Sequence, residues 1–495
     1  MSAALSSAAA VAVAAATLAV YWRYSSLLNH PHRRNDDSSS SSSGDSSSSA
    51  HEDLIGDTPL VLLHQLSKRL NRQIWVKMES YNPSGTGKDR AVLGMIRAAE
   101  AQGELPVSSS LSASASASAA ITWGSSIPEA CSTHKAESVA VEKSAATAAA
   151  AAAAAPSVSV SLEAMDAAID DAIARSRTGG LVVEGTSGST GIALAMLCQA
   201  RGHACVVVLP DDQAVEKQVV LRTLGAVVLV VPTAAIANPY HYVNVARKLA
   251  QRARDRRRHH HHHPNPIQAL FLDQFENPAN FDMHYHVTGP EIYRQCPDLS
   301  AFVMSCGTGG TLAGVSKYLK ERVRRRHFHR DIRCVLVDPP GSALYHKIQH
   351  GVIYASQQRE QSLKRHRYDT IAEGIGIDRL THNLALGLEC VDAAIRVTDQ
   401  DALDMAHWLL EQEGLWVGSS SAMNVVGAIQ TALELPVGSK IVTIICDAGH
   451  RHVTRFWNRA FCRAWGLQWP ADRPVQDRIP NCLRDVYPKD QEGKE

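Results

Sequence analysis

The chain has 495 residues, of which 45% are hydrophobic, and its 50 Lys and Arg against 49 Asp and Glu leave a formal net charge of +1. These values exclude a wholly disordered chain, a polytopic membrane protein and a nucleic-acid binder that depends on bulk positive charge. The 10 Cys are too sparse for a disulfide scaffold and show no zinc-like pairing. We therefore expect a reducing compartment, no metal site and no nucleic-acid partner.

The N-terminal segment, residues 2–22, contains no charged residue and is rich in Ala and Val. As a helix it would be about 30 Å long, which matches the hydrocarbon core of a bilayer. Arg23, Arg33 and Arg34 follow it, so the pattern predicts a single-pass membrane anchor whose following chain faces the cytosol. An Ala-rich leader that does not insert is the alternative interpretation.

Low-complexity runs divide the rest of the chain. The Ser-rich run after the anchor predicts a flexible linker, since it cannot bury apolar surface. Two further runs are interpreted as insertions, and the second carries five consecutive histidines, for which we favour a solvated loop over a metal site because no second ligand cluster is evident. The predicted organisation is an anchor and linker at 1–50, a folded region at 51–470 with insertions at about 106–160 and 254–266, and a C-terminal tail at 471–495.

Short apolar runs alternate with helical stretches between these insertions. Such alternation predicts an α/β fold with two lobes and a mostly parallel sheet covered by helices on both faces. Ligands of such sheets bind beyond the carboxyl ends of the strands, so the loops there are the places to look for chemistry. The predicted strands are 181–183, 205–209, 227–231, 302–305, 334–337 and 441–445.

The first informative loop is the turn-rich segment 82–90, which leads into a predicted helix at 91–100 and contains Lys88. A lysine at the start of a helix is electrostatically unfavourable, and the same field favours loss of its proton. Such a lysine suits Schiff-base chemistry. A solvated lysine in a turn is the alternative.

The Thr186 loop, residues 186–191, follows the predicted strand 181–183 and precedes a predicted helix at 192–200. Backbone N–H groups and hydroxyls converge at the start of this helix, where they would bind a carboxylate well. An ordinary helix cap rich in Ser and Thr is the alternative.

The Gly307 loop, residues 306–311, follows the predicted strand 302–305 and opens a helix at 312–322. Its glycines let backbone N–H groups approach an anion, and a phosphate would fit there. The spacing is neither that of a P-loop nor G-x-G-x-x-G, which disfavours a nucleoside triphosphate or a dinucleotide. A tight turn without a ligand is the alternative. Together, the two loops match a ligand that carries both a phosphate and a carboxylate.

Six motifs occur in the order found in pyridoxal-phosphate cysteine synthases, and the chain resembles that family from about Leu54 to about Trp457. It is most similar to the membrane-tethered cysteine synthase 2 branch, which implies a place at the mitochondrial outer membrane. The motifs are the Lys88 segment, the Thr186 loop, residues 273–275 with 277–280, the Gly307 loop, residues 373–376 and residues 418–421.

The resemblance implies a fold-type-II enzyme, with two α/β lobes and pyridoxal 5'-phosphate in the cleft between them. It implies that Lys88 is the catalytic lysine that carries the cofactor, and that Ser420, or Ser419 or Ser421 if the register shifts, faces the pyridine nitrogen. The implied phosphate cup is Gly307, Thr308, Gly309, Gly310 and Thr311, with Ser189 as a further cofactor contact. The implied substrate-binding residues are Thr186, Ser187, Ser189, Thr190 and Gln274.

Two positions depart from the family pattern. Ser189 stands where many members have Asn, so a shorter hydroxyl must reach the cofactor and the substrate carboxylate through water or a shifted loop. Ala422 stands where the family has Gly after the paired serines, which affects the local turn. Both departures bear on substrate preference more than on the identity of the cofactor.

The activity that the resemblance implies is β-replacement, in which O-acetyl-L-serine and sulfide give L-cysteine, usually on a homodimer. Lys88 would remove the Cα proton as the general base. The alternatives are another reaction of the same scaffold, such as that of cystathionine β-synthase or a cysteine desulfhydrase, and a membrane-tethered protein that binds the cofactor without turnover.

Overall fold

The structure is a computed structural model, and it describes residues 49–107, 161–259, 267–325, 331–354 and 370–486. These residues belong to one compact unit. The anchor segment, nearly all of the linker, nearly all of the first insertion and the histidine run after its first residue lie outside the described ranges.

The transmembrane helix predicted from the sequence has to be corrected. Within the described ranges, no helix is both long enough and apolar enough to cross a membrane. Helix α10 (Tyr242–His259) has 18 residues, but its many arginines would be costly in a bilayer. Residues 2–22, on which the prediction was based, lie outside the described ranges.

The larger of two sheets has six strands in the order β1-β2-β10-β7-β8-β9. Only β1 and β2 run antiparallel, and the other neighbours in this sheet are parallel. A parallel strand is buried on both faces, and this explains the unbroken apolar runs in the sequence. The strands are β1 (Leu60–Leu62), β2 (Gln73–Met78), β7 (Ala301–Ser305), β8 (Arg333–Asp338), β9 (Ala393–Arg396) and β10 (Lys440–Ile445).

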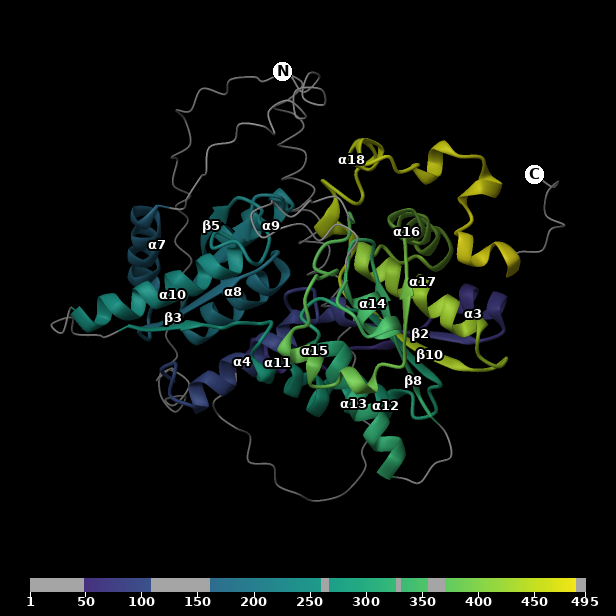
Figure 1. The fold of residues 1–495 in the computed structure, drawn as a ribbon, viewed down its shortest axis with the longest axis horizontal. Helices are drawn as coiled ribbons and strands as arrows, with labels where there is room; N and C mark the ends of the chain where they lie inside the picture. Colours follow the sequence, from purple (N-terminus) through teal and green to yellow (C-terminus); the bar gives the residue numbers. More distant parts are fainter. Residues whose placement is uncertain (1–48, 108–160, 260–266, 326–330, 355–369, 487–495) are drawn as a thin grey trace. The chain divides into compact units, whose positions relative to one another are not determined.

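Helices cover both faces of the larger sheet (Figure 1). Successive side chains of a strand point to opposite faces, and in β7 Val303 packs into one core while Phe302 packs into the other. The first core is closed by α3 (His64–Leu70), α16 (Asp399–Glu413) and α17 (Ser419–Leu433). The second is closed by α12 (Gly289–Gln295), α13 (Gly310–Arg325) and α14 (Leu344–His350).

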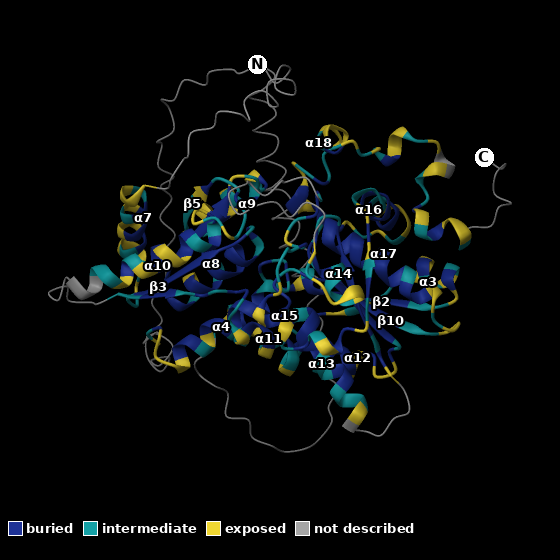
Figure 2. Cartoon of the chain, viewed as in Figure 1, coloured by how far each residue is buried: buried dark blue, intermediate teal, exposed yellow. Residues whose placement is uncertain are grey.

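The smaller sheet has four parallel strands in the order β5-β4-β3-β6. The strands are β3 (Gly180–Gly185), β4 (Ala204–Pro210), β5 (Val227–Val231) and β6 (Gln268–Phe271). One face packs on α7 (Leu162–Arg175) and α10, and the other on α4 (Lys88–Ala101), α8 (Ser189–Arg201) and α9 (Val215–Thr223). Figure 2 shows the central strands of both sheets buried beneath their partly exposed helices.

A helical run across residues 278–295 carries a single π-helical turn. It consists of α11 (Pro278–Met283), the π turn His284–Thr288 and α12. Such turns often occur at functional sites. Here the turn places the buried His284 with its Nε2 atom 3.0 Å from Thr311 Oγ1, at the start of α13. The remaining α-helices are α2 (Ala50–Asp53), α15 (His382–Ala385) and α18 (Arg459–Ala464).

The α/β fold predicted from the sequence is confirmed. The six predicted strands correspond to β3, β4, β5, β7, β8 and β10. They belong to two sheets, as expected of two lobes. Strands β1, β2, β6 and β9 were not predicted. The stretch expected to be a C-terminal tail places Leu483 in the core beside α17, fully buried.

Candidate active site

One cavity, of about 220 Å³, is lined by loops from both sheets. Four helices begin at or beside it, because Lys88, Ser189, Gly310 and Ser419 are the first residues of α4, α8, α13 and α17. A helix N-terminus presents unpaired N–H groups and positive potential, so the cavity suits an anionic ligand. The predicted site residues that line it are Lys88, Ser187, Ser189, Thr190, Gln274, Gly307, Thr308, Thr311 and Ser420.

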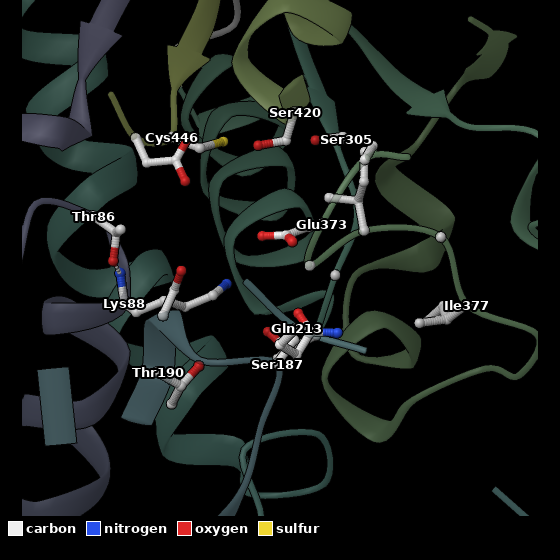
Figure 3. Close-up of a pocket in the computed structure, with 18 of the residues that line it drawn as sticks. Thr86, Lys88, Ser187, Thr190, Gln213, Ser305, Glu373, Ile377, Ser420 and Cys446 are labelled. Atoms are coloured by element: carbon white, nitrogen blue, oxygen red, sulfur yellow. Dashed lines mark hydrogen bonds between the residues drawn. The ribbon is translucent and has the colours of Figure 1, made fainter. Parts of the chain in front are cut away.

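Lys88 points into the cavity, on the same side as Thr190 and Cys446 (Figure 3). Its backbone N–H donates to Thr86 Oγ1 at 3.1 Å, which holds the first turn of α4 in place. Burial lowers the pKa of the Lys88 ammonium, although the carboxylate of Asp447 acts in the opposite direction. A lysine at this position loses its proton more readily than a lysine in water.

The Gly307 loop comes close to neighbouring backbone. A Cβ atom on Gly307 would lie 2.3 Å from the carbonyl oxygen of Gly374, and Gly309 has a φ of +92°, where a side chain causes strain. The amides at the start of α13 have no helical acceptor. The Gly307 loop and the start of α13 therefore form a cradle of backbone N–H groups that a ligand can approach without meeting side chains of the glycines.

Three predicted site residues do not line the cavity: Thr186, Gly309 and Gly310. Thr186 instead shapes its own loop, since its Oγ1 accepts a hydrogen bond of 3.1 Å from the Gly188 N–H. A Cβ atom on Gly310 would lie 2.3 Å from Asn280 Oδ1, so Gly310 allows α11 to pack against the start of α13.

The three adjacent serines of α17 have different surroundings. Ser420 lines the cavity, and Figure 3 shows its hydroxyl turned toward Cys446. Ser421 is used by the backbone, because its Oγ accepts from the Cys446 N–H at 2.9 Å. Ser419 is buried, and its Oγ has no hydrogen-bond partner among the described residues. Of the three alternatives, the geometry favours Ser420 for contact with a ligand.

The two departures from the family pattern lie in different surroundings. Ser189 lines the cavity, and its Oγ lies 3.5 Å from Nη2 of Arg451, which also donates to the backbone of Ser84. Ala422 is fully buried in the core on α17. The hydroxyl at 189 is therefore the departure that a ligand would meet.

A cluster of charges at the cavity went unnoticed in the sequence. Its centre is Glu373, whose carboxylate Figure 3 shows within the cavity. Glu373 pairs with Lys217, its Oε1 lies 2.9 Å from Arg455 Nε, and its Oε2 lies 3.5 Å from His452 Nδ1. The other ring nitrogen of His452 lies 2.8 Å from Asp447 Oδ2. The cluster links α9 of the smaller sheet's lobe to segments of the larger sheet's lobe.

The charges in this cluster determine the protonation of its members. Burial alone would lower the pKa of His452, but Asp447 and Glu373 outweigh it and raise the value to about 9. Burial alone would raise the pKa of Glu373, but Lys217 and His452 hold it well below its usual range. At neutral pH the imidazolium of His452 is therefore paired with two carboxylates. The motif 373–376 was visible in the sequence, yet nothing local in it indicates these distant partners.

We predict that His452 makes stability depend on pH. Its pKa rises from 6.5 to about 9 on folding, so its contribution is fully present below pH 6.5 and is lost as the pH rises through 9. Between these values the free energy of unfolding should fall by up to about 3 kcal/mol more in the wild type than in His452→Gln. Denaturant unfolding at several pH values measures this, and equal slopes for the two proteins would contradict it.

Comparison with known proteins decides the family. The sequence profile of the family described as "Pyridoxal-phosphate dependent enzyme" matches residues 51–155 and 153–447. The chain belongs to this family. Pyridoxal phosphate is therefore the cofactor, as predicted from the resemblance.

Relatives within the family are similar over most of their length. A Saccharomyces cerevisiae protein, provisionally named a mitochondrial cysteine synthase, is 39% identical over 83% of this chain and 84% of its own. Cysteine synthase 2 of Neurospora crassa is 39% identical over 82% of this chain and 72% of its own. The crystal structure of O-ureido-L-serine synthase shares the fold with a TM-score of 0.55, at 24% identity, over 82% of this chain and 93% of that chain.

The residues around the cavity fit the family's cofactor. The N–H cradle of the Gly307 loop suits a phosphate, and Lys88 reaches the same cavity with a lowered pKa. Ser305, which lines the cavity, buries a hydroxyl oxygen that lacks a hydrogen-bond partner among the described residues, so this oxygen can form a hydrogen bond with a ligand. Lys88 as covalent attachment point, the loop as phosphate cup and Ser420 as partner of the ring nitrogen stay predictions.

Proposed function

We propose that this chain is a cysteine synthase that makes L-cysteine from O-acetyl-L-serine and sulfide. The proposal is carried by one observation: the chain is 39% identical to proteins named cysteine synthases over more than four fifths of its length. The cavity supports it, because it combines an amine of lowered pKa with two anion-binding loops.

Each part of the cavity has a task in this reaction. The N–H groups at the start of α8, with the hydroxyls of Ser187 and Ser189, would hold the substrate carboxylate. Bound pyridoxal phosphate makes the substrate's Cα–H bond acidic. Lys88 Nζ, whose pKa is lowered by burial, would take that proton in its neutral form. The bond from Cβ to acetate then breaks, sulfide forms the new bond to Cβ, and the proton held on Lys88 Nζ returns to Cα.

Ser420 is expected to favour elimination. It offers a neutral hydroxyl, whereas a carboxylate in its place would hold a proton on the ring nitrogen. Without a proton on the ring nitrogen, the cofactor ring stabilises negative charge on the substrate's Cα less well. Acetate should therefore leave soon after the Cα proton is removed. This step depends on the assignment of Ser420 to the ring nitrogen.

A panel of substrates tests the proposal. The purified protein, loaded with pyridoxal phosphate, is assayed with O-acetyl-L-serine plus sulfide, with L-serine plus homocysteine, and with L-cysteine alone. We expect the first pair to be turned over with the highest kcat/KM. A preference for the second pair would indicate cystathionine synthesis, release of sulfide from cysteine would indicate a desulfhydrase, and no turnover would indicate a protein that only binds the cofactor.

We also propose a mitochondrial location and a homodimer. The location is supported by the name of the yeast relative, and the homodimer by the family resemblance alone. The outer membrane was implied by the family resemblance and the orientation toward the cytosol was inferred from the membrane anchor, and nothing further supports either. Subcellular fractionation and light scattering on the purified protein test the two proposals.

A further inference from the structure

The ion pair of Lys217 with Glu373 joins the two lobes at the cavity, which both residues line. Lys217 lies on α9, which packs against the smaller sheet. Glu373 belongs to the larger sheet's lobe, because Asp399 at the start of α16 holds the residues before it. Asp399 accepts from Thr370 Oγ1 at 2.6 Å and from the Ile371 N–H at 2.9 Å. The side chains of Lys217 and Glu373 are 3% and 6% exposed, so water competes little with their ion pair.

Two further contacts between the lobes flank this ion pair. Glu216, next to Lys217 on α9, accepts from the Thr454 N–H at 2.9 Å and from its Oγ1 at 2.6 Å. Nη1 of Arg455 donates to the backbone carbonyl oxygen of Asp212 at 2.6 Å. The hydrogen bonds of Glu216 are exposed to solvent, where water offers equivalent partners. We therefore expect the buried ion pair to be the strongest of these three contacts.

The two members of the ion pair differ in what they would lose if the lobes moved apart. Glu373 would keep two other cations, because Arg455 and His452 belong to its own lobe and lie 2.9 Å and 3.5 Å from its carboxylate. Lys217 would lose this carboxylate but would meet water, which hydrates a lysine ammonium strongly. The separation would leave neither charge both buried and unpaired, which is the costly case. The ion pair is therefore able to open and close reversibly.

We propose that Lys217 and Glu373 form a lobe latch, and that this latch determines how much of the substrate becomes cysteine and how much is lost as pyruvate. The inference rests on the proposed function, since it names the products of that reaction. Neither side chain has to touch the reacting atoms, so both are positioning residues for the reaction.

The chemistry of the proposed reaction gives the lobe latch this role. Once acetate has left, the rest of the substrate has two fates: sulfide bonds to Cβ and gives cysteine, or the remaining carbon chain leaves the cavity. Each O-acetyl-L-serine lost in the second way takes up a water molecule and yields acetate, pyruvate and ammonia. A closed cavity excludes water and holds reactive groups until their partner arrives. A weaker lobe latch therefore favours the second fate.

The ratio of products tests the lobe latch in the cofactor-loaded protein. Lys217→Met removes the cation at similar length, and Glu373→Gln removes the negative charge from the other lobe. With O-acetyl-L-serine and limiting sulfide, we expect either variant to raise the ratio of pyruvate to cysteine about tenfold. The double variant should add little to the larger single effect, since both substitutions break one ion pair. If Lys217→Met does not fold, Glu373→Gln still breaks the same ion pair.

Lys320 offers a matched control within one lobe. Its side chain on α13 is 7% exposed and pairs with Asp331 at 2.9 Å and with Asp392 at 2.8 Å. Asp331 and Asp392 precede β8 and β9 of the larger sheet, and none of the three residues lines the cavity. Lys320→Met should therefore lower stability without changing the ratio of products.

A second measurement needs no turnover of substrate. Phenylhydrazine reacts with the aldehyde carbon of bound pyridoxal phosphate and has to enter the cavity to do so, and the coloured product reports the rate. Lys217→Met and Glu373→Gln should each raise this rate about tenfold, because the lobes separate more often without the ion pair. Lys320→Met should react at the rate of the wild type.

Several results would overturn the proposal. An unchanged product ratio in Lys217→Met and Glu373→Gln would show that the ion pair has no part in retaining the substrate, even if phenylhydrazine reacts faster. An equal rise in Lys320→Met would trace the effect to general destabilisation, and additive single effects would show that the two residues act independently. If the wild type makes no cysteine, the proposed function fails, yet the phenylhydrazine rates still decide whether the ion pair holds the lobes together.

Discussion

Replacing Lys88 with alanine is expected to lower the rate of cysteine formation by at least about 10³-fold. The side chain begins α4, points into the cavity and has a pKa lowered by burial. In the proposed reaction it both holds the cofactor and takes the Cα proton, whereas Lys217, which also lines the cavity, is paired with Glu373. Steady-state assays with O-acetyl-L-serine and sulfide measure the loss.

Lys248 offers a control, since it is exposed on α10 and stacks over Tyr240 away from the cavity lining. Lys248→Ala should retain the wild-type rate. Reduction of the loaded wild type with borohydride, followed by peptide mass spectrometry, should place the cofactor on Lys88. A cofactor found on another lysine, or full activity in Lys88→Ala, would end the proposed mechanism.

Replacing Arg90 with methionine is expected to destabilise the protein by about 3–5 kcal/mol. Arg90 is fully buried two residues beyond Lys88. It donates to Glu79 at 2.8 Å and 2.9 Å and to both carboxylate oxygens of Glu291 at 2.7 Å. Burial alone would lower its pKa, but these carboxylates raise it further above its usual range. Without the guanidinium, two buried carboxylates lose their main partner.

Denaturant unfolding of the apoprotein measures this effect, with Arg252→Met as the matched control. Arg252 forms a comparable pair with Asp166 at 2.6 Å, but both side chains are about one third exposed. A pair of this kind contributes about 0–1 kcal/mol, so its loss should be small. Equal losses for the two variants would contradict the importance of burial. Because Glu79 also lines the cavity, Arg90→Met should weaken cofactor binding as well.

Some features of the site follow directly from neighbouring residues. The Lys88 segment, the Thr186 loop and the Gly307 loop are each continuous, and each lies where a helix begins. Local rules for helix starts and glycine-rich turns were enough to locate them. Strands were equally visible in the sequence where both of their faces are buried, as in β4, all of whose residues are buried.

Other features depend on the tertiary structure. Strand β1 has three residues that are partly or fully exposed, and β9 is only half buried, so neither has a periodic apolar signal. Glu373 meets Lys217 and His452 from positions 156 and 79 residues away in the chain. Gln274 forms its three hydrogen bonds with Glu184, Gly185 and Thr190, which lie 84 to 90 residues before it in the chain.

The sequence by itself determined the α/β class and the three loops, because each depends on patterns of side chains within a few positions of one another, and the resemblance carried by six motifs implied the cofactor. Only the tertiary structure decided which serine of α17 lines the cavity, which cations neutralise Glu373 and which residues the Gln274 amide contacts. These depend on hydrogen bonds and charges between residues far apart in the chain. Burial strengthens such interactions, and burial is a property of the folded protein.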